Sequence, residues 1–177
     1  MDILPVIKMG HPNLRKSSDS VPIDQIQTPK YQQLIDNLIT TMRAEDGAGI
    51  AAPQVDVLER IFVMEVDNNP RYPDKPSFPL LVAINPTIKP IGDQQIDSWE
   101  GCLSIPKIRG KLKRWDRVKI TGYDRNGNFF EKELSGFAAV VAQHELDHLN
   151  GILFIDRMTD LKTLCFREEF ERFYFTN

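Results

Sequence analysis

The chain has 177 residues, of which 22 are basic, 25 are acidic and 41% are hydrophobic. This balance is typical of an ordinary globular protein and excludes disordered, collagen-like and membrane-spanning classes. The formal net charge of −3 gives no basic field that would attract nucleic acid or anionic lipid. The amino terminus has neither a secretory signal nor a transit peptide. We therefore expect a single cytoplasmic domain, residues 1–177, with no nucleic-acid or membrane partner.

The first predicted element is an amphipathic helix between about Thr28 and Asp46, with one apolar stripe at i, i+3, i+4, i+7 spacing. A proline-rich stretch, 67–79, predicts a surface loop. An Asn126-Gly127 pair predicts a tight hairpin turn. Runs rich in Val, Ile, Phe and Tyr predict four strands, at 61–66, 80–85, 117–123 and 129–134.

Two further helices are predicted after the hairpin. Residues 136–150 are largely apolar at first and end before Gly151, which favours a buried helix. Residues 160–173 have a rough apolar stripe and predict a C-terminal amphipathic helix. Together these elements predict an α+β fold, with antiparallel β-sheets packed around the buried helix.

The buried helix contains the sequence His144-Glu145-Leu146-Asp147-His148. Residues four apart share one face of a helix, so the two imidazoles can reach one divalent ion. Glu145 then lies in a neighbouring sector, where its carboxylate can act as a general base without binding the ion. Desolvating so many polar groups is costly without a compensating cation. The segment therefore predicts a metal site.

A catalytic site of this kind normally has three protein ligands, so a third must come from elsewhere in the chain. His11 lies in a turn-like tetrapeptide and is expected to be a surface residue. Glu168 lies 20 residues after His148, a distance that zinc peptidases use, although it also fits the solvated face of the last helix. Cys102 follows a glycine at an expected strand end, where a thiolate could meet the helix, although a free cysteine is usually a small buried hydrophobe. These residues alone leave Cys102 and Glu168 open.

Three sequence blocks place this chain near a known family. The blocks are Gly47-Ala-Gly-Ile-Ala-Ala-Pro-Gln54, Glu100-Gly-Cys-Leu-Ser104 and Gln143-His-Glu-Leu-Asp-His148. In order and spacing they resemble the motifs of peptide deformylase, and the resemblance extends to Met9–Arg15 and to the overall length. It implies a hydrolase that removes the N-formyl group from the formylmethionine of nascent polypeptides and releases formate.

The resemblance implies that Cys102, His144 and His148 bind the metal and that Glu145 is the acid/base. A water activated by the metal would attack the formyl carbon. The backbone N–H of Leu103 and the side-chain amide of Gln54 would share the charge on the formyl oxygen. The metal in this family is generally Fe²⁺, and Zn²⁺ or Ni²⁺ can occupy the same site.

Substrate contacts are also implied by the resemblance. An extended peptide would add along the backbone of Ala48, Gly49 and Ile50, beside Glu100 and Gly101. Ala48 stands where the family commonly has a larger aliphatic residue, which affects the pocket rim. Glu100 would pair with Arg109. The methionine side chain would occupy an apolar pocket lined by Ile50, Phe137, Val140, Val141 and the ring of His144.

Two other functions compete with this interpretation. One is a zinc endopeptidase with His144, His148 and Glu168 as ligands; the other is a non-catalytic module with a closed structural metal site. The C-terminal segment 166–177 is mixed in charge, so proximity to the ribosome but not direct docking on it is expected. A monomer is the expected state.

Overall fold

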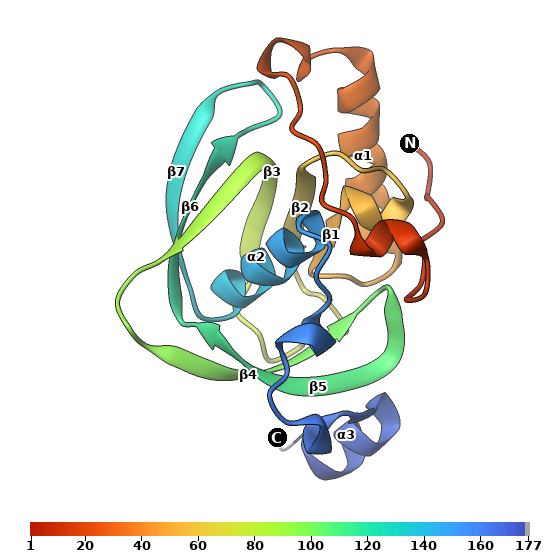
Figure 1. The fold of residues 1–177 in the computed structure, drawn as a ribbon, viewed down its shortest axis with the longest axis vertical. Helices are drawn as coiled ribbons and strands as arrows, with labels where there is room; N and C mark the ends of the chain where they lie inside the picture. Colours follow the sequence, from red (N-terminus) through yellow and green to blue (C-terminus); the bar gives the residue numbers. More distant parts are fainter. Residues whose placement is uncertain (176–177) are drawn as a thin grey trace.

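Two antiparallel sheets surround a central helix in the computed structural model of the chain (Figure 1). The structure describes residues 1–175, and Thr176 and Asn177, the end of the C-terminal segment, lie outside the described residues. The larger sheet has the order β1-β2-β3-β6-β7 and the smaller sheet the order β4-β5-β8. The strands are β1 Gly49–Ala51, β2 Ile61–Val66, β3 Phe78–Pro90, β4 Gln95–Cys102, β5 Ile105–Trp115, β6 Arg117–Tyr123, β7 Phe129–Ser135 and β8 Cys165–Phe166.

Helix α1, Pro29–Ala44, forms where the amphipathic stripe predicts it. Proline occupies its first turn, where no amide hydrogen bond is lost. One face is buried against β1 and β2, through residues that include Tyr31, Ile35, Leu38 and Met42. The helix thus packs against the β1–β2 side of the larger sheet, next to the strand that follows it in the chain.

Helix α2, Gly136–Leu149, is the central helix in Figure 1. Its first half is apolar on all sides because it contacts strands of both sheets. Gly151 follows it with a φ of 71°, a left-handed conformation that glycine adopts without strain. The expected buried helix is therefore confirmed, and its polar second half is buried as well.

The predicted hairpin is also confirmed, since β6 pairs with β7 from Arg117–Ser135 to Tyr123–Phe129. Strands β4 and β5, in contrast, were not predicted. The inward-facing positions of β4 are Ser98, Glu100 and Cys102, so the buried face of this strand is polar and lacks the apolar alternation that marks a strand.

The expected C-terminal helix is shorter than the sequence predicts. Helix α3 covers only Arg167–Phe173. Asp160 instead begins a short 3₁₀ turn, Leu161–Thr163, by accepting a hydrogen bond from the Lys162 amide at 2.9 Å. The next residues are extended because β8 pairs with β5. Within residues 1–175, none of the helices has the length and apolar character needed to cross a bilayer.

Candidate metal centre

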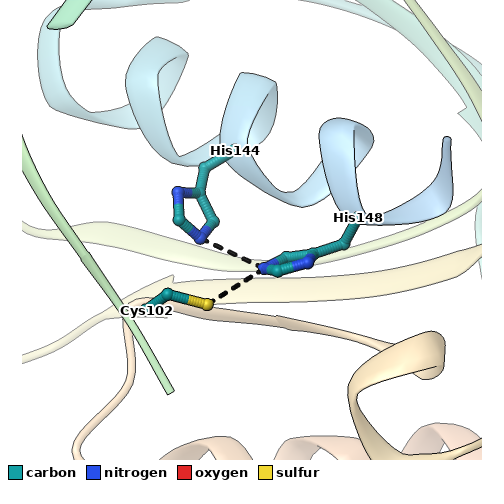
Figure 2. Close-up of side chains that lie close together, drawn as sticks. All are labelled: Cys102, His144 and His148. Atoms are coloured by element: carbon teal, nitrogen blue, oxygen red, sulfur yellow. Dashed lines mark hydrogen bonds between the residues drawn. The ribbon is translucent and has the colours of Figure 1, made fainter. Parts of the chain in front are cut away.

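The metal-binding pattern predicted on α2 lies against the end of β4. His144 and His148 project from the same face of the helix, and Cys102 approaches them from the strand (Figure 2). The Cys102 Sγ lies 3.2 Å from the His148 Nε2, which lies 3.2 Å from the His144 Nε2. All three residues are buried, and their donor atoms lie within 4.8 Å of one another. The structure therefore brings together the two histidines and one of the two candidate third ligands.

These three donors fit a divalent transition-metal ion. Ligands about 2.0 to 2.3 Å from a tetrahedral ion lie roughly 3 to 4 Å from each other, and the distances here are of that size. Burial opposes ionisation of the Cys102 thiol, yet the neighbouring His148 and His144 hold its pKa well below the usual value. The thiol also accepts hydrogen bonds from the Ser104 amide at 3.4 Å and the Gln54 Nε2 at 3.6 Å. Both contacts favour the thiolate that a metal requires.

A buried charge network orients His144. Its Nδ1 lies 2.8 Å from the Glu100 carboxylate, which fixes Nδ1 as the protonated nitrogen and leaves Nε2 free for a metal. Arg114 donates to both oxygens of Glu100, at 2.8 and 3.0 Å, and to Asp147 at 2.6 Å. Burial would raise the pKa of Glu100, but His144 and Arg114 bring it down to about 2.

The expected pair between Glu100 and Arg109 is wrong, because Arg114 takes that place. Arg109 lies instead over Gly101, where an added Cβ would overlap its guanidinium. Arg114 lies five positions after Arg109 along β5, and from there its guanidinium pairs with both Glu100 and Asp147. One sequence signal could have indicated a buried arginine: Glu100 and Asp147 lie next to predicted metal ligands, and buried carboxylates need a nearby cation.

Glu145 is buried and lines the same pocket as two of the donors, Cys102 and His144. Its Oε2 has no hydrogen-bond partner among residues 1–175. Burial raises the pKa of this carboxyl to about 7, close to the range in which a group can both accept and donate a proton. Glu145 is therefore placed beside the donor set but is not one of its members.

Gly49 makes room for that carboxylate. A Cβ built on Gly49 would lie 2.6 Å from the Glu145 Oε1 and 2.8 Å from its Cγ. We expect Gly49→Ala to displace the Glu145 side chain and lower kcat by roughly 10-fold or more, since small errors in position are costly in catalysis. Metal content should remain at the wild-type level, because the donor atoms are untouched. Wild-type kcat in this variant would contradict the assigned contact.

Gln54 and Leu103 line the pocket from two different segments. The Gln54 Oε1 accepts from the Ala51 amide at 2.9 Å, so the opposite end of the amide, Nε2, points toward Cys102 and Ser104. Lys8 donates to the Leu103 carbonyl at 2.9 Å and thereby ties the turn after Cys102 to the N-terminal segment. The Gln54 amide thus faces the metal donor Cys102, and Leu103 lines the pocket beside it.

The pocket has an apolar side formed by Phe137, Val140 and Val141, together with the ring of His144. Ile50 does not line it: the side chain is fully buried in the core that α1 covers, because β1 turns alternate side chains to opposite faces. The remaining expected substrate residues do line the pocket: Ala48, Gly49, Glu100, Gly101 and Arg109. The pocket is also lined by Arg71, Tyr72 and Trp99, which were not predicted.

The other proposed ligands lie elsewhere. Glu168 is exposed on α3, and His11 begins a 3₁₀ turn, where it accepts a hydrogen bond from the Asn13 amide. In the described part of the chain, Cys102, His144 and His148 are the one group of such residues close enough to share an ion. Cys102 and Cys165 are both free thiols.

Comparison with known proteins identifies the family. The model of the polypeptide deformylase family matches residues 3–164. The chain belongs to this family. Peptide deformylase 2 of Ralstonia nicotianae is 44% identical over 166 residues, which cover 94% of this chain and 93% of that protein. Peptide deformylase 1 of Prochlorococcus marinus is 43% identical over 172 residues, covering 97% and 88%.

Solved structures of deformylases share the fold. A class I type b peptide deformylase of Acinetobacter baumannii, bound to Met-Ala-Ser, superposes with a TM-score of 0.85 at 38% identity, over 89% of this chain and 99% of that one. The enzyme of Thermotoga maritima superposes with a TM-score of 0.78 at 37% identity, over 90% and 100%. The predicted α+β architecture and the resemblance to peptide deformylase are both confirmed. The chain is a metallohydrolase with a buried candidate metal site.

Proposed function

We propose that Cys102, His144 and His148 hold a ferrous ion and that Glu145 transfers the proton as a formyl group is removed from a formylmethionyl peptide. The observation that supports this most directly is the buried Glu145 Oε2, which has no hydrogen-bond partner within residues 1–175 and belongs to a side chain that lines the pocket beside Cys102 and His144. When bound, a divalent ion lowers the pKa of a water that it binds and withdraws charge from a carbonyl oxygen.

The chain's own residues carry the remaining steps. Glu145 accepts the proton of the attacking water and later gives it to the departing amine, for which a pKa of about 7 is suited. The Gln54 Nε2 and the Leu103 amide orient the formyl oxygen and stabilise its developing charge. Both groups line the pocket in which Glu145 is buried.

The peptide would lie against the edge of the larger sheet. Strand β1 is the first strand in the sheet order and pairs with β2 on one side within the described residues. Its second edge therefore offers backbone groups to an added strand. The methionine side chain would contact Phe137, Val140 and Val141. The deformylase of Acinetobacter baumannii bound to Met-Ala-Ser supports a peptide that begins with methionine.

Iron is proposed from the resemblance and from the donor set, since thiolate and imidazole ligands accept several divalent metals. Protein purified without oxygen should contain mainly iron, and should release formate from formyl-Met-Ala-Ser. Metal-depleted protein should regain that activity when Fe²⁺ is supplied anaerobically. Absence of formate release under these conditions would refute the iron assignment.

We propose further that the chain acts in the cytoplasm as a one-domain monomer, close to ribosomes but not docked on them. Segment 166–175 contains Arg167 and Arg172 but also Glu168, Glu169 and Glu171, a mixture that RNA would not attract strongly. Sedimentation velocity should give the mass of one chain, and the protein should not pellet with ribosomes at physiological salt. Co-pelleting would contradict this proposal.

A further inference from the structure

A groove of about 640 Å³ continues from the catalytic pocket. The two cavities share part of their walls, including Trp99, Arg109 and Phe137. The far wall of the groove is formed by Phe170 of α3 and by Tyr174, the residue that follows this helix. A peptide that enters the catalytic pocket by its first residue therefore has a path for the residues that follow.

The far wall is held in place by contacts with β4 and β5 of the smaller sheet. The segment that forms it follows Leu164, the last residue that the family model matches. Strand β8 pairs with β5, with Cys165 opposite Arg109. The rings of Phe170 and Tyr174 lie 4.9 and 5.0 Å from the ring of Trp99 on β4. Residues of the C-terminal segment between Arg167 and Phe175 thus form part of the groove wall.

Two arginines lie where the groove meets the catalytic pocket, and neither has a counter-ion among the described residues 1–175. Arg109 is 6% exposed, and its hydrogen bond is to the carbonyl of its neighbour Ile108, at 3.1 Å. The Arg71 Nε is buried without a hydrogen-bond partner. Within residues 1–175, neither arginine forms an ion pair with a carboxylate. Burial and the charge of Arg71 lower the pKa of Arg109.

The acidic side chains of the groove do not compensate for these charges. Asp97 is paired with Lys111 and Lys113, at 3.0 and 3.1 Å. Glu171 is paired with Arg167 at 2.6 Å. Asp74 is exposed to solvent, and within residues 1–175 it forms no ion pair with either arginine. A buried cation without a partner is unfavourable, and a carboxylate from a ligand would relieve that cost.

We propose that this groove binds the residues that follow the formylmethionine, and that Arg71 and Arg109 bind the carboxylate of an Asp or Glu side chain among them. The inference rests on the proposed placement of the methionine side chain against Phe137, Val140 and Val141. Arg109 is well placed for this contact, because its guanidinium lies over Gly101, next to the metal ligand Cys102. The enzyme would then deformylate peptides with an acidic early residue more efficiently than their neutral counterparts.

The test compares formylmethionyl pentapeptide amides that differ only by Glu or Gln at position two, three or four. At one of these positions, kcat/KM should be roughly 10-fold or more higher for the Glu peptide, the size expected for hydrogen bonds to charged groups. The difference should lie in KM, because the groove does not touch the reacting atoms. A free-acid and an amidated formyl-Met-Ala-Ser would show whether a terminal carboxylate also binds.

Two arginine variants test whether the preference for Glu peptides arises in the groove. Arg71→Gln should bring the Glu-to-Gln ratio toward one, whereas Arg117→Gln, an exposed arginine on β6 paired with Glu133, should leave it unchanged. Equal kcat/KM for all matched peptides in the wild type, or a ratio that Arg71→Gln does not alter, would overturn the inference while leaving the proposed function intact. Failure to release formate from any neutral peptide would overturn both.

Discussion

Glu145→Gln should abolish most turnover without loss of metal. The substitution keeps the shape of the side chain and its contact with Gly49, but an amide can neither accept the proton of water nor pass it to the amine. General acid–base catalysis contributes roughly 10² to 10⁴-fold, and we expect kcat to fall by that factor. Formate release under saturating formyl-Met-Ala-Ser measures kcat, and elemental analysis of the same sample measures bound metal.

A matched control for this prediction is Glu133→Gln, which alters an exposed carboxylate on β7 that pairs with Arg117. This variant should retain wild-type kcat and metal content. If Glu145→Gln instead turned over at a near-normal rate, the proton-transfer role would have to be assigned to another group. Loss of metal in Glu145→Gln would indicate that this carboxylate is a ligand.

The largest effect on stability is expected from Arg114→Met. The side chain of Arg114 is 5% exposed and pairs with two buried carboxylates, Glu100 and Asp147, of which Asp147 also pairs with the half-exposed Arg157. Removing one partner of a buried ion pair typically lowers the free energy of unfolding by about 3 to 5 kcal/mol, since the remaining charge is left uncompensated. Metal affinity should also fall by roughly 10 to 100-fold because Glu100 would no longer hold His144 firmly.

Arg109→Met provides the comparison, because Arg109 is equally buried but pairs with no carboxylate in the described chain. Its free energy of unfolding should change far less. Urea denaturation of metal-depleted protein separates the two variants. If Arg114→Met and Arg109→Met were equally stable, the charge network would not have the structural role that its geometry indicates. Adding Glu100→Gln and Asp147→Asn to Arg114→Met should restore part of the lost stability.

Much of the fold could be predicted because local patterns agree with the final packing. The stripe of α1, the apolar run of α2 and the Asn126-Gly127 turn each coincide with an observed element. The small sheet escaped prediction because β4 turns Ser98, Glu100 and Cys102 inward. The buried face of β4 carries polar residues of the metal centre, so the strand lacks the alternation of apolar and polar residues by which strands are predicted.

Some residues of the site could likewise be predicted from local sequence, whereas others depended on the fold. Spacing along one helix could identify His144, Glu145 and His148, since the three lie within two turns. The choice between Cys102 and Glu168 depended on which distant segment reaches the helix, and the resemblance implied Cys102. The partner of Glu100 required the register of β5: Glu100 lies opposite Gly110, and Arg114 reaches it from four residues further along the strand. Such a pairing is set by three-dimensional structure and not by local sequence.

X-ray absorption spectroscopy of the metal-loaded protein tests the metal site most directly, because it counts the atoms bound to the ion. The arrangement of Cys102, His144 and His148 predicts one sulfur at about 2.3 Å and two imidazole nitrogens at about 2.0 to 2.1 Å for a zinc-loaded sample, with the sulfur lost in Cys102→Ser. A spectrum of nitrogen and oxygen alone in the wild type would contradict the assignment.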